Sequence, residues 1–328
     1  MIFILFKEGQ GLGNQLFLYL FAKTKAEELG KDFCVADLKN FKGKSFIKLS
    51  FDYQCSKENI PEDVVCFDER SYYDSKFDAF AYFFDQRVAE ISDNSLISGI
   101  YQAEKYYDNL SYHARRLITY SFSQKNNDID LSKTCVLNIR GGEYRDNKEL
   151  VLPKKYWVNA MKFISNKYPE IERFVITTDD PNYAKSILPH LEIISCDIES
   201  SYQPLLFYKY YIISNSSFSL IPLHQNLNKP FVIAPLLWSR YENKRNIWMS
   251  PANYYKKFKW FDGEKIVPSK RAIELITNTV NYYESRLNVL CENRDLETKF
   301  NLIRLIKKSI PVSLKTPLKK ILYFVGIR

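Results

Sequence analysis

The sequence is poor in the residues that build metal centres and disulfide frameworks. Its 328 residues include only three histidines and six cysteines, and no two cysteines form a CxxC pair. Structural zinc sites and disulfide-stapled domains depend on such clusters, so the sequence argues against both. Cys34 and Cys135 fall inside apolar, strand-like runs, where a free cysteine acts as a small core residue. The cysteine pattern therefore favours a reducing, cytoplasmic setting.

Long apolar runs are also missing. The apolar start at 1–6 is far shorter than the core of a signal peptide, and no later run approaches the roughly 18 residues of a membrane span. The net charge of +9 is a modest basic excess, and no nucleic-acid-binding motif accompanies it, so no nucleic-acid partner is expected. What remains, 46% hydrophobic and 26% charged residues, is the balance of a globular protein long enough for two domains.

The most informative stretch is 134–144, where a short apolar run leads into Arg140, two glycines and Glu143. The run predicts a buried strand. In open α/β sheets ligands bind at the carboxyl ends of strands, and the planar fork of an arginine suits phosphate. These residues alone support an alternative equally well, in which Arg140 pairs with a nearby acid and the glycines form only a turn.

A strand, a glycine-rich turn and a helix open the chain. Residues 2–6 are typical of a strand, glycines follow at 9, 11 and 13, and apolar residues then recur at helical spacing up to Gly30, a C-cap candidate. Such a turn lets backbone amides and a helix N-terminus approach an anion. The glycines match neither a dinucleotide GxGxxG nor a P-loop. The glycines support two interpretations equally well. One is a ligand loop, and the other is a simple turn in which all three glycines need unusual backbone geometry.

Strands and helices alternate along the second half, which predicts a parallel, doubly wound sheet. The expected strands there are 134–140, 174–177, 192–194, 210–213 and 231–234, with helices at 153–166, 181–187 and 203–209 and another from 216. The first half predicts strands at 33–36 and 96–101, a helix from 102 toward 120, and irregular or helical structure over 50–95 that shapes an acceptor cleft.

Polar side chains follow two of these strands. Asp179 and Asp180 come after one, where a carboxylate can hold a ribose or sugar hydroxyl; the alternative is capping of the next helix, which Asp does well. Ser216, Ser217 and Ser219 lie at the start of a helix, where hydroxyls and amides suit a pyrophosphate. Capping alone would explain one serine, but it explains several less easily.

The polar, turn-forming residues 121–133 are the best candidate for a linker. The predicted division is an N-terminal α/β domain over 1–125 on the acceptor side, a Rossmann-like donor domain over 126–290 and a basic tail over 291–328. Asp128 and Asp130 form a DxD pair within the linker, but acid pairs are common in solvated linkers, so we do not predict a metal there.

Five motifs follow one another over most of 1–240. They are GLGNQLF at 11–17, a GYxQSEKYF-like segment at 99–107, an HxRRGDY-like segment at 138–144, NSSFS at 215–219 and VIAPxxW at 232–238. In this order they resemble family 11 of the glycosyltransferases, the α-1,2-fucosyltransferases, and more distantly the α-1,6- and protein O-fucosyltransferases. The chain departs from the family pattern where Asn138 replaces the histidine, Gly141 the second arginine and Glu143 the aspartate. It also has Leu220 and Ile221 in place of paired tryptophans, and serines in place of an acid near 200.

The resemblance implies an α/β fold of the GT-B type, with two Rossmann-like domains facing across a cleft. It implies an inverting, metal-independent transfer of fucose from GDP-β-L-fucose to a hydroxyl, typically O2 of a galactoside, with no cofactor beyond the donor. The residues it assigns to donor binding are Gly11, Gly13, Asn14, Arg140, Asp179, Ser216, Ser217 and Ser219. Arg140, Asn14 and Glu143 are the candidate catalytic residues.

The role of the general base stays open between Glu143 and Asp37, and Glu143 has a second candidate role in orienting Arg140. Two other functions also remain open. One is the same fold using another nucleotide sugar, because Gly141 replaces an arginine. The other is a catalytically silent protein that binds a carbohydrate or nucleotide and has kept Arg140.

The tail at 299–328 carries eight basic residues and no acid. Its apolar residues recur at helical spacing, which predicts amphipathic helices. Such an end can lie on an anionic membrane surface. That would fit a transferase acting at the cytoplasmic face of a membrane on a glycan or lipid-linked glycan precursor. Packed or frayed terminal helices with a solvated charged face are the alternative.

Overall fold

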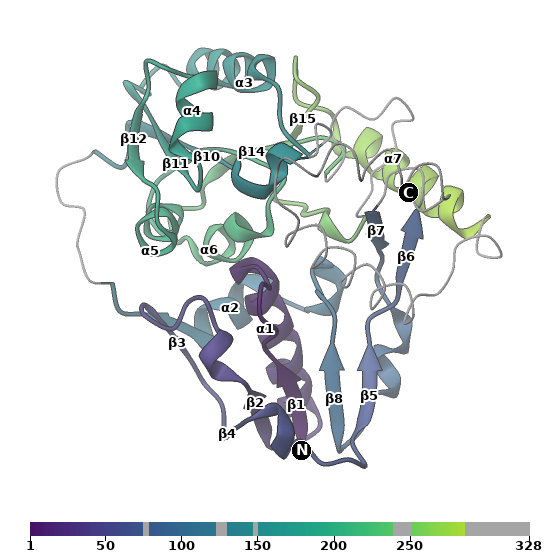
Figure 1. The fold of residues 1–328 in the computed structure, drawn as a ribbon. Coiled ribbons are helices and arrows are strands. Elements are labelled where there is room, and N and C mark those ends of the chain that lie inside the picture. The colour runs from purple at the N-terminus through teal and green to yellow at the C-terminus, as the bar shows by residue number, and fades with distance from the viewer. Residues whose placement is uncertain (75–78, 123–129, 147–149, 239–250, 286–328) are drawn as a thin grey trace, which may run out of the picture.

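The computed structural model describes residues 1–74, 79–122, 130–146, 150–238 and 251–285. Within them the chain builds two α/β domains, drawn one above the other in Figure 1, each around a parallel sheet. The predicted α/β fold class with two Rossmann-like domains is confirmed by these two sheets. The heart of the expected linker, with Asp128, and the tail at 299–328 lie outside the described residues, so what was predicted for them stays a prediction.

The N-terminal sheet has the order β4-β2-β1-β8-β5, and all its pairings are parallel. Its strands are β1 (Ile2–Leu5), β2 (Phe33–Ala36), β4 (Tyr53–Cys55), β5 (Val65–Asp68) and β8 (Ser95–Ser98). The predicted helix follows β1 as α1 (Leu12–Glu28), and Gly30 beyond it has a φ of +61°. Because the chain leaves β1 toward β2 while β8 lies on the other side, the topological switch point falls between β1 and β8.

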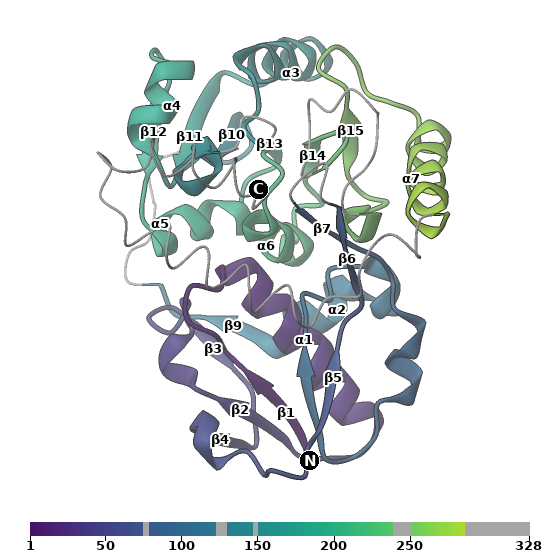
Figure 2. The ribbon, with the colours of Figure 1, turned by 45° about the vertical axis from the view of Figure 1, so that its right-hand side comes forward.

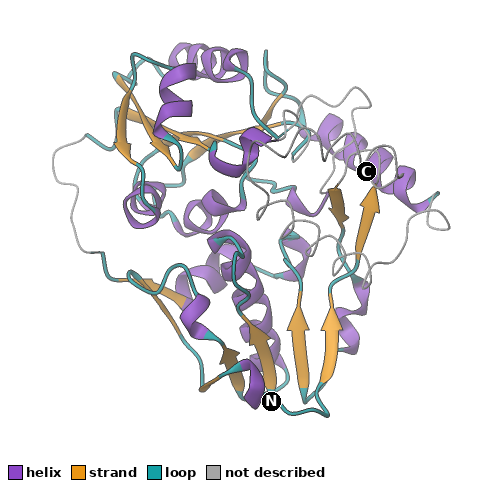
Figure 3. Cartoon of the chain, in the orientation of Figure 1, coloured by secondary structure: helices purple, strands orange, loops and turns teal. Residues whose placement is uncertain are grey.

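The C-terminal sheet has the order β12-β11-β10-β13-β14-β15. Its strands are β10 (Thr134–Ile139), β11 (Arg173–Thr178), β12 (Glu192–Ser195), β13 (Tyr210–Ile213), β14 (Phe231–Pro235) and β15 (Lys259–Phe261), all paired in parallel. The connecting helices are α3 (Lys154–Lys167), α4 (Pro181–Ile187), α5 (Ile198–Tyr202) and α6 (Leu220–Gln225). This alternation of strands and helices (Figure 3) confirms the predicted parallel sheet and its five expected strands. The helix expected at 203–209 is wrong, because α5 ends at Tyr202 and a 3₁₀ segment follows at Gln203–Leu206. The strand order puts the switch point between β10 and β13.

The expectations for 50–95 and 102–120 are only partly right. The first stretch has irregular residues and two 3₁₀ turns, but it also contains four strands that were not predicted: β4, β5 and the antiparallel hairpin of β6 (Ser71–Asp74) and β7 (Ala79–Tyr82). The second contains a 3₁₀ turn, then α2 (Leu110–Leu117) and β9 (Ile118–Tyr120), which pairs with β3 (Ile47–Leu49). Strands of three or four residues leave too little sequence to show a period, and their partners come from distant parts of the chain.

The last described helix, α7 (Ser269–Glu284), was not predicted, and it crosses back to the N-terminal domain. Figure 2 shows it beside the β6–β7 hairpin, where Tyr283 packs with Tyr72 and Ala81. A single apolar core also runs from α1 to the face of the C-terminal sheet covered by α6. The two domains are therefore packed together at several places. Over the described part of the chain, no helix has the length and apolarity needed to span a membrane.

Candidate functional site

The carboxyl ends of the two sheets meet where the start of α1 packs on the turn at Ser217–Ser219, which follows β13. Gly13 makes this approach possible, because a Cβ there would lie 2.4 Å from the carbonyl carbon of Ser217 and 2.7 Å from the backbone nitrogen of Phe218. Both neighbours are backbone atoms and cannot turn aside. The glycine-rich turn of one domain is thus fitted against the serine-rich turn of the other.

Among the glycines at 9, 11 and 13, only Gly9 has a positive φ, of +78°. Gly11 is the N-cap of α1 with an ordinary φ of −68°, and a Cβ there would meet nothing within 4 Å. The interpretation that all three positions need unusual backbone geometry is therefore wrong. Gly13 is required for space at the domain contact, which only the tertiary structure reveals.

Asn14 joins the two switch points through its side-chain amide. Its Oδ1 accepts a hydrogen bond from Gln102 Nε2 at 2.7 Å and another from Ser217 Oγ at 2.8 Å. Gln102 is buried beyond the end of β8, and its Oε1 accepts from Asn253 Nδ2. We call Asn253, Gln102, Asn14 and Ser217 the amide chain. Both lone pairs of Asn14 Oδ1 accept hydrogen bonds within the amide chain. Asn14 Nδ2 has no partner among the described residues, so it can donate to a ligand.

The loop that carries Gln102 is held by a buried carboxyl group, Glu69, just beyond β5. Glu69 Oε2 accepts from the backbone nitrogens of Ile100 at 2.7 Å and Tyr101 at 2.8 Å, and Oε1 accepts from the hydroxyl of Tyr106 at 2.9 Å. Burial raises the pKa of Glu69 to about 7, although these hydrogen bonds oppose the shift. The sequence pattern gave no signal for Glu69, because it follows a strand that was not predicted.

Arg140 follows β10 on the opposite side of the junction, and its side chain is 31% exposed. Its Nη1 lies 2.6 Å from Asp179 Oδ2 and its Nη2 3.5 Å from Glu143 Oε1. The guanidinium also lies over the ring of Tyr144, 5.5 Å from its centroid. The structure therefore shows Arg140 paired with a nearby acid, one of the two alternatives that the sequence left open, and shows Glu143 in position to orient it.

The two aspartates after β11 do different things. Asp179 lies under the turn that follows Arg140, where its Oδ1 accepts from Gly141 N at 2.9 Å. Asp180 is the N-cap of α4 and accepts from Tyr183 N at 2.9 Å, as the capping alternative predicts. Partial burial would raise the pKa of Asp180, but this bond and the ion pair with Arg145 outweigh it and hold that pKa below its usual range.

Buried polar groups without partners mark the end of β13. Ser214 Oγ and both side-chain atoms of Asn215 have no hydrogen-bond partner among the described residues, and both side chains are almost wholly buried. The carbonyl of Asn215 accepts from the hydroxyl of Tyr144 at 3.3 Å, which ties this strand end to the Arg140 turn. Because buried polar groups are nearly always paired, an unpaired amide at a switch point indicates a place for a polar ligand.

The three predicted serines have different roles in the structure. Ser217 belongs to the amide chain. Ser216 caps the turn, its Oγ accepting from Phe218 N at 3.4 Å. Ser219 is fully buried, and its hydroxyl donates to the carbonyl of Ser216 at 3.2 Å, so it shapes the turn from inside.

Each of the two candidate bases lies beside a basic side chain. Asp37, beyond β2, lies 3.8 Å from Lys39 Nζ and accepts from Lys57 N at 3.4 Å. Glu143 is 69% exposed beside Arg140. The described residues also contain no group of three or more His, Cys, Asp or Glu placed to hold a metal ion.

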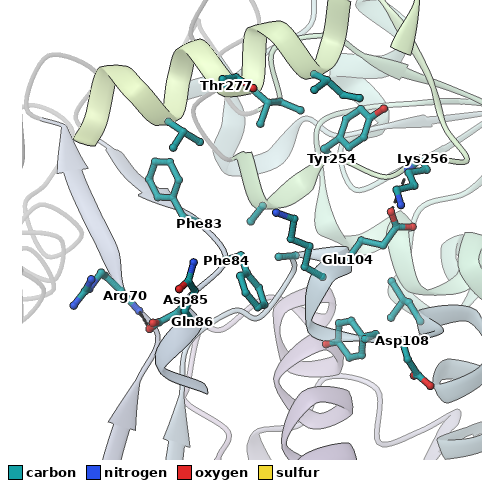
Figure 4. A pocket seen from close by; sticks show the side chains of 18 of the residues that line it. Arg70, Phe83, Phe84, Asp85, Gln86, Glu104, Asp108, Tyr254, Lys256 and Thr277 are labelled. Carbon is teal, nitrogen blue, oxygen red and sulfur yellow. Dashed lines mark hydrogen bonds between the residues drawn. The ribbon is translucent and has the colours of Figure 1, made fainter. Parts of the chain in front are cut away.

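A large cavity lies at the carboxyl edge of the N-terminal sheet, beneath α7 (Figure 4). Its volume is about 1310 Å³. The wall includes Ala103 and Ala252, the chain neighbours of Gln102 and Asn253, so the cavity adjoins the amide chain. Arg140 is not part of its wall.

No protein-family model matches the chain, and no curated protein matches its sequence. Solved structures do match. Fucosyltransferase NodZ from Bradyrhizobium is similar at 9% identity with a TM-score of 0.44, over 67% of this chain and 91% of NodZ. The E. coli heptosyltransferase WaaC with ADP matches at 11% identity with a TM-score of 0.42, over 85% of this chain and all of WaaC. A family 9 glycosyl transferase from Veillonella parvula matches at 8% with a TM-score of 0.43, over 87% and 96%. Membership of family 11 stays a prediction.

Proposed function

We propose that this protein is an inverting, metal-independent glycosyltransferase that moves fucose from GDP-β-L-fucose to a hydroxyl of a surface-glycan precursor, with O2 of galactose as the favoured position. The observation that carries the proposal is the junction of the two switch points. Asn14 Oδ1 accepts there from Gln102 of one domain and Ser217 of the other. Two ligand-binding sheet edges face each other, as a reaction between a donor and an acceptor requires.

The donor diphosphate is assigned to the C-terminal edge. Asp179 is paired with Nη1 of Arg140 and Glu143 lies 3.5 Å from Nη2, so Nε and the second N–H of Nη2 are the donors assigned to phosphate oxygens. Two uncharged donors are assigned to the diphosphate as well, the amide of Asn215 and Nδ2 of Asn14, neither of which has a partner among the described residues. Gly11 and Gly13 bring the start of α1 close, and Ser216 and Ser217 form the turn opposite.

Transfer breaks the bond between C1 of fucose and the β-phosphate oxygen while the acceptor oxygen bonds to C1. Negative charge grows on the departing GDP, and the proton of the acceptor hydroxyl passes to a base. Donors fixed in place before the reaction stabilise that charge, and losing one typically costs ~3 kcal/mol in the transition state. Arg140 and Asn14 are assigned this role. Glu143, 3.5 Å from Arg140, is assigned to orienting it.

A second candidate, the same reaction with another nucleotide sugar, is favoured by the surroundings of Gly141. A Cβ at 141 would lie 2.7 Å from Asp180 Cβ and 2.8 Å from Tyr183 Cδ1. The second arginine of the family pattern therefore has no room in this arrangement. A donor site that lacks this charge can differ in the nucleotide it prefers.

The acceptor is assigned to the N-terminal side, with 1–125 as acceptor domain, 126–290 as donor domain and 291–328 as tail. We place the protein in the cytoplasm, with the tail in peripheral contact with the membrane when the acceptor is lipid-linked. The eight basic residues of 299–328 support this placement.

The test is thermal unfolding with GDP, GDP-fucose, GDP-mannose or UDP-galactose, with and without EDTA, because a ligand that binds the folded state raises its melting temperature. Arg140→Ala should lose the shift. Arg173→Ala is the matched control, since Arg173 is also ion-paired but lies at the amino end of β11. Selective stabilisation by GDP and GDP-fucose supports the first candidate, and preference for another nucleotide supports the second. Nucleotide binding without any transfer of labelled sugar would support the third function, a catalytically silent protein that binds a nucleotide.

A further inference from the structure

The cavity beneath α7 is a large feature that the proposed donor site does not use. It opens beside Arg70, just after β5, and beside Glu104, just after β8, so it occupies the edge where open α/β sheets bind ligands. Its volume of about 1310 Å³ exceeds the roughly 300–1,000 Å³ of a typical small-molecule pocket. There is room for a ligand of several units.

The electrostatics of the cavity argue against an anionic occupant. Five basic and five acidic side chains line it, so its formal net charge is zero. Some of these are already paired, as Arg87 Nη2 is with Asp85 Oδ2 at 2.6 Å. Burial lowers the pKa of His224 well below its usual value, so this lining residue adds no positive charge near neutral pH. A nucleotide diphosphate would meet as many carboxylates as cations.

Aromatic rings supply the remaining recognition. Phe84 and Tyr254 are partly buried in the cavity wall, and Figure 4 shows them on opposite sides of the open space, with Phe83 at the left and Thr277 at the top. The ring of Tyr254 stacks on the ring of Trp260, with the two centroids 5.6 Å apart and an angle of 22° between the ring planes. Ring faces together with scattered carboxylates and amines match a ligand that has both C–H faces and many hydroxyls.

We propose that this cavity binds an uncharged oligosaccharide through stacking on Phe84 and Tyr254. That this oligosaccharide is the acceptor of the transfer rests on the function proposed above. That the cavity binds it does not. The cavity adjoins the amide chain through Ala103 and Ala252, so a sugar that fills it ends near Asn14. A purely apolar ligand would displace the water that solvates the charged groups of the lining, which is costly.

The test is binding without donor and without turnover. N-acetyllactosamine and its longer uncharged oligomers are titrated against the full chain, and binding is followed by saturation-transfer NMR. Phe84→Ala and Tyr254→Ala should weaken binding by about tenfold or more, given the usual strength of aromatic contacts. Phe84→Leu keeps apolar bulk without a ring face and should weaken it as well, which guards against a folding defect in the alanine variant. Phe207→Ala removes an aromatic side chain that is 44% exposed and outside the cavity, and should bind like the wild type.

Each result decides the proposal. Binding that Phe84→Ala and Tyr254→Ala leave intact, or no binding of these saccharides to the wild type, would overturn it. Loss of the GDP-induced rise in melting temperature in Phe84→Ala would also overturn it, because the cavity would then hold the nucleotide. Saccharide binding that depends on these rings in a protein that transfers no sugar would keep the cavity assignment and reject the transferase function.

Discussion

Replacing Gly13 with alanine tests whether the domain contact at the start of α1 is as tight as the structure shows. The new Cβ would lie 2.4 Å from the carbonyl carbon of Ser217, 2.5 Å from its oxygen and 2.7 Å from Phe218 N. Ordinary contact begins near 3.4 Å, so the turn must retreat by about 1 Å. The bond from Ser217 Oγ to Asn14 Oδ1, now 2.8 Å, would then exceed hydrogen-bonding range.

Overpacking of this kind costs about 1–3 kcal/mol and the lost hydrogen bond about 1 kcal/mol more, ~2–4 kcal/mol in all. At about 2 °C per kcal/mol for a chain of this size, the melting temperature should fall by roughly 4–8 °C. Gly11→Ser is the matched control, because nothing lies within 4 Å of a Cβ there and serine is a good N-cap. Calorimetry that finds Gly13→Ala as stable as the wild type, or Gly11→Ser equally destabilised, would refute the reasoning.

Three further predictions concern the strand ends and the tail. Arg140→Ala should lower kcat by about 10²–10³-fold while the chain stays folded, and unchanged turnover would remove Arg140 from the mechanism. The folded-state pKa of Glu69, about 7 against an ordinary 4.5, means that its stabilising contribution is complete below pH 4.5 and declines as pH rises to about 7, by at most ~3 kcal/mol. The difference in free energy of unfolding between wild type and Glu69→Gln, measured by denaturant titration, should therefore change between pH 4.5 and about 7. A difference that stays constant over this range would contradict the raised pKa of Glu69. Deletion of 299–328 should weaken binding to anionic liposomes, and equal binding would leave only a structural role for the tail.

The elements that could be predicted are those that carry their own signal. The strand before Arg140 is a continuous apolar run, and the helix after Gly11 is rich in apolar residues up to Gly30. Both are buried almost throughout, and these signals need no knowledge of distant residues. The edge strands β4 and β5 could not be found, because three or four residues show no period and their pairing depends on partners elsewhere in the chain. The candidate site follows the same rule. Arg140 and Asn14 stand out in the sequence, whereas Gln102 gains a role only through Asn14, and Asn253 through Gln102.

The sequence by itself determined two α/β halves and the polar residues that end their strands, because burial periodicity and turn chemistry act over a few neighbouring residues. It left open whether Arg140 pairs with an acid and why Gly13 is a glycine. Only the tertiary structure decided these, by placing Asp179 2.6 Å from Arg140 and the Ser217 backbone against Gly13. Such contacts join residues far apart in the chain, and their distances are set by how the two sheets pack, which no local pattern encodes.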